Sequence, residues 1–199
     1  ATNFNPFITD INAVRGQETG YATLNPLGPG GLTLSNGNLT YTRGSTDWEA
    51  VLGTQSMTAG NNWYFEVFFD TAQSSGNGAI LEVGIALETF TAHNSYLGTD
   101  SNSWMYQNNN GSNGQKGHNG SFSTYGLSLI TGDTLGVSLD LSPGGSNGVL
   151  TFYKNGVSMG YAYNNLDCTI NYFPAFSAYA SGKGTANFGQ KPFKYVPPE

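Results

Sequence analysis

Large apolar and polar residues alternate with a period of two along most of the chain from Leu32 onward. The clearest runs cover residues 63–69, 81–87 and 135–141, where every second residue is a large apolar one. Successive side chains of a strand point to opposite faces, so this spacing predicts strands with one buried face. No segment has the apolar spacing of an amphipathic helix. The pattern therefore predicts an all-β protein.

Turn signals separate these runs. Asn36-Gly37 and Asn155-Gly156 each lie between short apolar runs. An Asn-Gly pair in this setting is typical of a two-residue hairpin turn. Short strands that are interrupted this often indicate an antiparallel sandwich or barrel.

Two stretches break the alternation. The first contains Asn25-Pro26 and Gly28-Pro29-Gly30-Gly31, which are turn signals. We therefore predict an N-terminal arm over residues 1–31, suited to docking on a neighbour, and a sandwich domain over residues 32–199. The second stretch runs from Thr89 to Tyr125. It is too long for a hairpin connection, and we predict that it is a functional loop.

Composition and charge narrow the choice of partner. Glycine accounts for 28 of the 199 residues, aromatic residues for 14% and charged residues for 10%, with a net charge of -6. Many aromatic and few charged residues argue against a disordered chain. Only 7 Lys and Arg residues are present, which argues against binding to nucleic acid or to an anionic membrane surface. Because no run of about 18 apolar residues occurs, we predict no membrane insertion.

No residue pattern predicts catalysis, a metal site or a cofactor. His93 and His118 do not share a zinc-ligand spacing. Glu66 and Glu82 lie on separate predicted strands, and a glycosidase would need two such carboxyl groups on one face. We favour a hydrogen-bonded structural role for Glu66. The oxygens of residues 100–102 lack the second acidic residue that calcium would favour. We therefore predict a protein that is not an enzyme.

Aromatic and amide side chains gather outside the clearest alternating runs. Large rigid rings beside adaptable amides are typical of protein-binding and sugar-binding surfaces. We expect Tyr106 and Tyr161 to be exposed. For Trp104 the alternative to a binding role is a buried position that closes the end of the sandwich. Tyr179, next to a Gly-containing turn, adds to this surface. The predicted partner-binding residues are Tyr96, Trp104, Tyr106, Asn108, His118, Tyr161 and Tyr163.

Several segments, taken in order, resemble the SPRY (B30.2-like) domain family. Residues 63–67, Trp-Tyr-Phe-Glu-Val, resemble its Tyr-Trp-Glu-Val strand, and residues 82–86 resemble the Val-Gly-Val strand that follows. Residues 132–140 resemble its Gly-Asp-x-(Ile/Leu)-Gly strand, and residues 150–156 its Phe-x-x-Asn-Gly hairpin. Further matches in the loops and in the closing strands extend the resemblance over about residues 32–196.

This resemblance implies a bent antiparallel β-sandwich of the SPRY or concanavalin-like jelly-roll kind. It implies an interaction module without catalytic machinery that binds partners through loops at one rim. The low charge and the Gly, Asn and Ser bias resemble SPRY-like modules of bacteriophage virion proteins.

We therefore expect a non-enzymatic phage protein of the virion, in capsid decoration or in a tail or fibre appendage. Its partner would be a coat or neighbouring virion protein, or a host-surface protein or glycan, and a homo-oligomer is allowed. The alternatives are a cellular SPRY adaptor that binds short peptides in the cytoplasm and a carbohydrate-binding lectin-like module.

Overall fold

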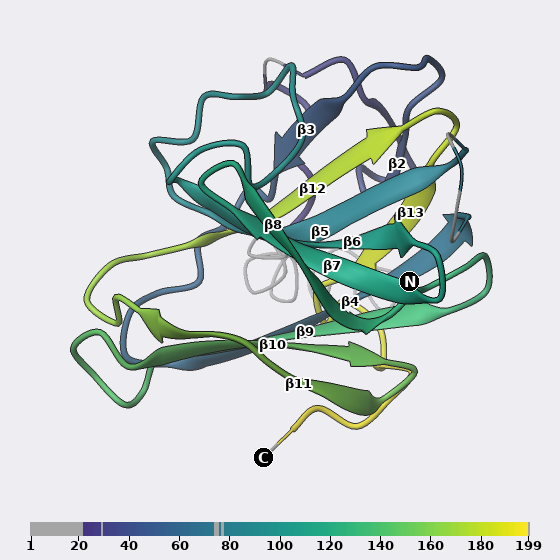
Figure 1. The fold of residues 1–199 in the computed structure, drawn as a ribbon. Helices are drawn as coiled ribbons and strands as arrows, with labels where there is room; N and C mark the ends of the chain where they lie inside the picture. The colour runs from purple at the N-terminus through teal and green to yellow at the C-terminus, as the bar shows by residue number, and fades with distance from the viewer. Residues whose placement is uncertain (1–21, 29, 74–75, 77, 199) are drawn as a thin grey trace, which may run out of the picture.

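The computed structural model describes residues 22–28, 30–73, 76 and 78–198, except for the side chains of Asn109 and Asn110. These residues form thirteen strands (Figure 1). No helix capable of crossing a membrane occurs among them. The strands are β1 (Thr33–Ser35), β2 (Thr40–Thr42), β3 (Glu49–Leu52), β4 (Asn62–Thr71), β5 (Ile80–Ala86), β6 (Ser103–Asn110), β7 (Asn113–His118), β8 (Ser121–Leu127), β9 (Thr134–Asp140), β10 (Gly148–Lys154), β11 (Val157–Leu166), β12 (Phe173–Tyr179) and β13 (Lys183–Asn187).

One sheet has seven strands in the order β1-β2-β13-β4-β9-β10-β11. Its centre is the antiparallel pair of β4 and β9, in which Phe65 lies opposite Val137 and Val67 opposite Leu135. All four side chains are buried. The alternation seen in the sequence thus places one apolar face of this sheet toward the core.

The second sheet has six strands in the order β3-β12-β5-β6-β7-β8. On β5, Leu81, Val83 and Ile85 are fully buried in the same core cluster as the apolar face of β4 and β9. The two sheets form the two layers visible in Figure 1. The prediction of an antiparallel all-β sandwich is confirmed.

The two-residue turn predicted at Asn155-Gly156 forms, whereas the predicted turn at Asn36-Gly37 is part of a four-residue connection, residues 36–39. The two residues between β10 and β11, Asn155 and Gly156, have φ angles of 50° and 80°. Positive φ at both positions is the requirement of a type I′ turn, which Asn and Gly meet at low cost. Asn36 and Gly37, between β1 and β2, also have positive φ.

The prediction of one long loop between Thr89 and Tyr125 is wrong. The loop spans residues 87–102, and the rest of this stretch belongs to β6, β7 and β8. These strands escape the period-two pattern because small and amide residues occupy many of their positions. At Gly114, for example, an added Cβ would lie 2.3 Å from a ring carbon of Tyr106, so the absence of a side chain lets that ring pack against the strand.

Part of the predicted N-terminal arm packs on the sandwich. Residues 1–21 and 29 lie outside the described residues, and the predicted boundary at residue 31 stays a prediction. Leu24 is fully buried, and its backbone N–H donates to the carbonyl of Asn38 at 2.8 Å.

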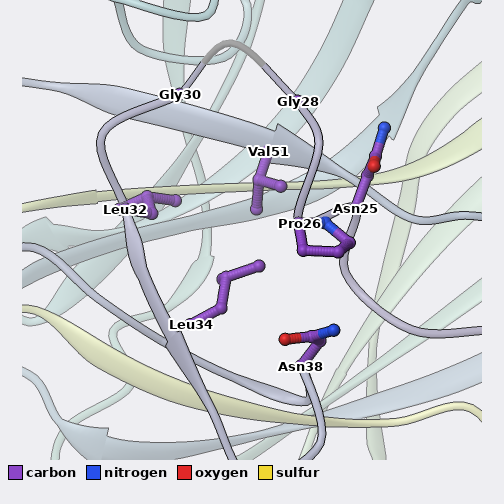
Figure 2. A pocket seen from close by; sticks show the side chains of 8 residues that line it. All are labelled: Asn25, Pro26, Gly28, Gly30, Leu32, Leu34, Asn38 and Val51. Atoms are coloured by element: carbon purple, nitrogen blue, oxygen red, sulfur yellow. The ribbon is translucent and has the colours of Figure 1, made fainter.

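A pocket of about 250 Å³ lies where this segment passes the sheet edge, and Figure 2 shows Leu32 and Leu34 on one side of it with Asn25 and Pro26 on the other. The lining residues are Asn25, Pro26, Gly28, Gly30, Leu32, Leu34, Asn38 and Val51.

Candidate functional site

Four aromatic side chains form a continuous row over the outer face of the six-stranded sheet. Tyr179 at the end of β12 lies 5.1 Å from Trp48, measured between ring centroids. Trp48 lies 6.2 Å from Tyr96, and Tyr96 lies 5.5 Å from Phe122 on β8. All four side chains keep contact with solvent, and Phe122 is 38% exposed. We call these four residues the aromatic row.

Backbone hydrogen bonds fix the end of the row at Tyr179 and Trp48. The amide of Ala180 donates to the carbonyl of Ser45 at 3.0 Å, and the amide of Ser181 donates to the carbonyl of Arg43 at 2.8 Å. Ala180 and Ser181 have φ angles of 47° and 71°. Left-handed backbone at residues with a side chain costs about 1–3 kcal/mol at each position, and such strain concentrates at binding sites.

A buried carboxyl group fixes the loop that carries Tyr96. The two oxygens of Glu82 accept hydrogen bonds from the backbone N–H of Leu97 at 2.8 Å and from the side-chain amide of Gln107 at 2.7 Å. Glu82 is fully buried. Burial raises the pKa of the Glu82 carboxyl to about 8, although these two hydrogen bonds oppose the shift.

The same loop is also fixed by packing and by a side-chain hydroxyl. Leu97 and Phe90 pack with Met105 in a second apolar cluster on the outer face of the sheet. The amide of Gly98 donates to Ser103 Oγ at 2.8 Å. Tyr96 therefore projects from a loop whose next residues are buried, which gives its ring a defined position.

Charged groups lie beside the row at its Trp48 end. The guanidinium of Arg43 is 2.6 Å from a carboxylate oxygen of Asp47 and 3.4 Å from one of Glu49. Hydrogen bonds from Ser45 and Arg43 lower the pKa of Asp47. Arg43 also donates to the carbonyl of Gly31 at 2.8 Å, so its side chain is shared between several partners.

Three of the predicted site residues come together elsewhere, at the end of the sandwich between the two sheets. The rings of Trp104 and His118 are stacked, with centroids 4.5 Å apart. Tyr163 on β11 meets His118 edge-on at 6.1 Å. All three are partly buried, and Trp104 packs against the core as its alternative assignment anticipated. Their role in binding stays a prediction.

Two other predicted site residues are in the core, and their assignment to a surface is corrected. Tyr106 is fully buried, packs against Phe152 and donates its hydroxyl to the carbonyl of Leu127 at 2.6 Å. Asn108 is fully buried, and its side-chain oxygen accepts the N–H of Leu81 at 2.8 Å. Both belong to β6, on the side that faces the other sheet, so no partner reaches them in this fold.

Tyr161 is exposed as predicted, with 70% of its surface accessible. It projects from β11 of the other sheet and is not part of the aromatic row. Sequence reasoning omitted Trp48 and Phe122 from the candidate surface. The signal for Trp48 was available, because a large ring stands at the end of the polar segment Arg43–Asp47.

The two glutamates considered for catalysis cannot meet. Glu66 lies on the outer face of the seven-stranded sheet, and Glu82 lies on the outer face of the six-stranded sheet, with the core between them. Glu66 accepts hydrogen bonds from the backbone N–H groups of Lys194 at 2.8 Å and Tyr195 at 2.9 Å. No group of three or more potential metal ligands occurs within the described ranges.

The sequence profile of the SPRY domain matches residues 62–191. The chain is 31% identical over 134 residues to the Ran-binding proteins 9/10 homolog of Drosophila melanogaster, covering 67% of this chain and 13% of that protein. It is 30% identical over 138 residues to Ran-binding protein 10 of Danio rerio, covering 67% of this chain and 20% of that protein. The chain thus spans no more than a fifth of either relative.

Solved structures agree on the fold. The SPRY domain of human HERC1 superposes with a TM-score of 0.63 at 22% identity, covering 81% of this chain and 94% of that one. The PSpry domain of TRIM65 gives a TM-score of 0.65 at 20% identity, covering 88% of this chain and 98% of that one.

The expectation of a phage virion protein is wrong. The relatives are cellular proteins, and they include the E3 ubiquitin-protein ligase RKP of Arabidopsis thaliana, 38% identical over 74 residues that cover 36% of this chain and 6% of the ligase. Low charge and a Gly, Asn and Ser bias reflect the many turns of a sandwich, and they do not distinguish a virion module from a cellular one.

Proposed function

Because the chain belongs to the SPRY domain family, we propose that it is a cellular adaptor module that captures short peptide segments of partner proteins on the aromatic row. SPRY domains are protein-interaction modules, and the domain itself is non-catalytic. The observation that carries the proposal is the set of four linked, solvent-accessible rings, two on strands and two on fixed loop segments. The proposal includes a cytoplasmic location, which is the location expected above for a cellular SPRY adaptor.

The spacing of the row suits an extended peptide. Its successive ring centroids are 5.1, 6.2 and 5.5 Å apart. Alternate side chains of an extended strand are about 6.5 Å apart. A peptide that runs along the row can therefore place every second side chain near a new ring. Rings that already have fixed positions lose little conformational entropy when the peptide binds.

The charged end of the row supplies orientation. The Arg43 guanidinium and the carboxylates of Asp47 and Glu49 lie on the segment that carries Trp48. A polar group on the peptide can pair with either sign at this end, whereas the rings at the Phe122 end favour apolar side chains. This asymmetry would set the direction in which a peptide lies.

The relatives give the proposal its biological setting. The names of two of them describe Ran-binding proteins, and that of a third describes a ubiquitin ligase. In each case this chain corresponds to a small part of the relative. We propose that it shares with them the presentation of a peptide-binding surface, and the nature of the partner is left to the experiment.

A random peptide library displayed on yeast tests the proposal. We expect clones that bind the wild-type chain and lose at least about tenfold in affinity with Tyr96→Ala or Phe122→Ala, because truncating an anchoring ring removes about 2 kcal/mol of binding. Phe68→Ala is the matched control, since this phenylalanine of β4 is 39% exposed and lies on the other sheet. If no selected clone loses affinity for the two row variants, the assignment of the site is overturned.

A further inference from the structure

A second aromatic surface lies on the outer face of the seven-stranded sheet, away from the aromatic row. A groove of about 350 Å³ lies there over β4, β9, β10 and β11, with Tyr64, Tyr153 and Tyr161 in its walls. Ser138 and Thr151 also line it. Smaller outward side chains beside three tyrosines make this part of the sheet concave, whereas a flat strand surface would have no groove.

The groove is aromatic and its rings are positioned by neighbours. Tyr64 packs edge-on against Tyr153 at 6.4 Å and against Phe193 at 5.0 Å. The Tyr64 ring lies close over Gly136, where an added Cβ would be 2.5 Å from the tyrosine oxygen. Tyr161 is 70% exposed and forms the open side.

The chain's own C-terminal segment shows what the groove accepts. Glu66, which is 3% exposed, accepts the backbone N–H groups of Lys194 and Tyr195 and so holds this segment across the sheet. Beyond that anchor, Pro197 and Pro198 line the groove together with the three tyrosines. In Figure 1 the yellow C-terminal segment passes the start of β11, consistent with this path.

We propose that this tyrosine groove binds proline-rich segments of partner proteins in the polyproline II conformation. Such segments are pre-ordered and have no internal hydrogen bonds, so they dock on aromatic grooves at low entropic cost. Their free carbonyl groups need donors, and the Asn62 amide and the hydroxyls of Ser138 and Thr151 line the groove. Asp140 also lines it and disfavours acidic segments.

Fluorescence polarisation with a fluorescein-labelled decaproline tests the proposal, with a Gly-Ser repeat of equal length as the control peptide. We expect saturable binding of decaproline alone. Tyr161→Ala should weaken it at least about tenfold, and Tyr161→Phe should retain it. Leu127→Ala, at an exposed position of β8 on the other sheet, should leave it unchanged. Because Tyr161 is largely exposed, its replacement leaves the fold intact.

The chain's own prolines give a second arm to the test. If the wild type fails to bind because its tail fills the groove, Pro197→Ala combined with Pro198→Ala in the full chain should bind decaproline, and this also supports the proposal. Absence of binding in both chains overturns it, as does binding that Tyr161→Ala leaves unchanged. A concentration-dependent dimer that both the proline and Tyr161→Ala variants abolish would instead assign the groove to the tail of a second copy.

Discussion

Replacing Glu82 by glutamine tests how the loop that carries Tyr96 is fixed to the six-stranded sheet. The carboxyl group is fully buried, and burial raises its pKa to about 8 from the ordinary value of 4.5. Between these two values the unfolded chain has lost the Glu82 proton, whereas the folded chain retains it. The folded chain therefore binds more protons, so the free energy of unfolding must fall as the pH rises through this window.

The size of this pH dependence follows from the single proton that the Glu82 carboxyl group loses. Each pH unit between about 5 and about 8 should remove about 1.4 kcal/mol from the free energy of unfolding of the wild-type chain, and the loss should level off above the folded pKa. The lowered pKa values of Asp47 and Asp133 act in the opposite sense. Their contribution is lost only below about pH 4, outside this window.

Urea denaturation followed by tryptophan fluorescence, at several pH values from about 5 to about 8, measures this slope. In Glu82→Gln the side chain has no proton to lose, so this part of the pH dependence should disappear. Glu88→Gln is the matched control, because Glu88 is an exposed glutamate of the following loop, and it should keep the wild-type slope. Equal slopes in the wild type and Glu82→Gln would refute the reasoning.

Three further predictions concern packing and backbone. Tyr106→Ala should destabilise the fold by about 3–5 kcal/mol, because it empties a fully buried site and removes the hydroxyl that donates to the carbonyl of Leu127. Thermal denaturation measures this loss of stability, and a loss below about 1 kcal/mol would contradict the prediction. Gly156→Val should lower the free energy of unfolding by about 1–3 kcal/mol through backbone strain at φ 80°. Crowding adds to this loss, because a Cβ there would lie 2.8 Å from Tyr195. An unchanged melting temperature would argue against the turn. Leu24→Ala should cost about 2–5 kcal/mol because Leu24 is fully buried, and a neutral effect in the same assay would show that the N-terminal segment is dispensable for folding.

The parts of the fold that the sequence predicted depend on neighbours in the chain. A period of two over residues 63–69 or 135–141 determines which side chains share a face, whatever the rest of the chain does. The type I′ turn at Asn155-Gly156 depends on two residues with low-cost positive φ. Both features can be read locally, and both occur in the structure.

The errors arose where the deciding contacts are distant in the sequence. Tyr106 seemed exposed because the period-two alternation stops in its segment, yet it packs on Gly114 and Phe152, which come from two other strands. The aromatic row joins Trp48 to Tyr179 across more than a hundred residues. Only the pairing of β12 with β3 brings these segments together, and no local pattern encodes that pairing.

The two buried glutamates share one structural logic. Each lies in a strand at a position that faces away from the core, where a half-exposed sheet would present a polar residue to water. Here Glu66 is covered by the C-terminal segment and Glu82 by the loop that follows β5, and each accepts a backbone N–H from the segment that covers it. A segment without strand pairing must find partners for its amides, and a carboxyl group on the sheet supplies them. The tyrosine groove and the aromatic row therefore each lie beside a segment that a glutamate fixes to the sheet. An outward-facing glutamate in an otherwise apolar strand is thus evidence that another segment crosses that face.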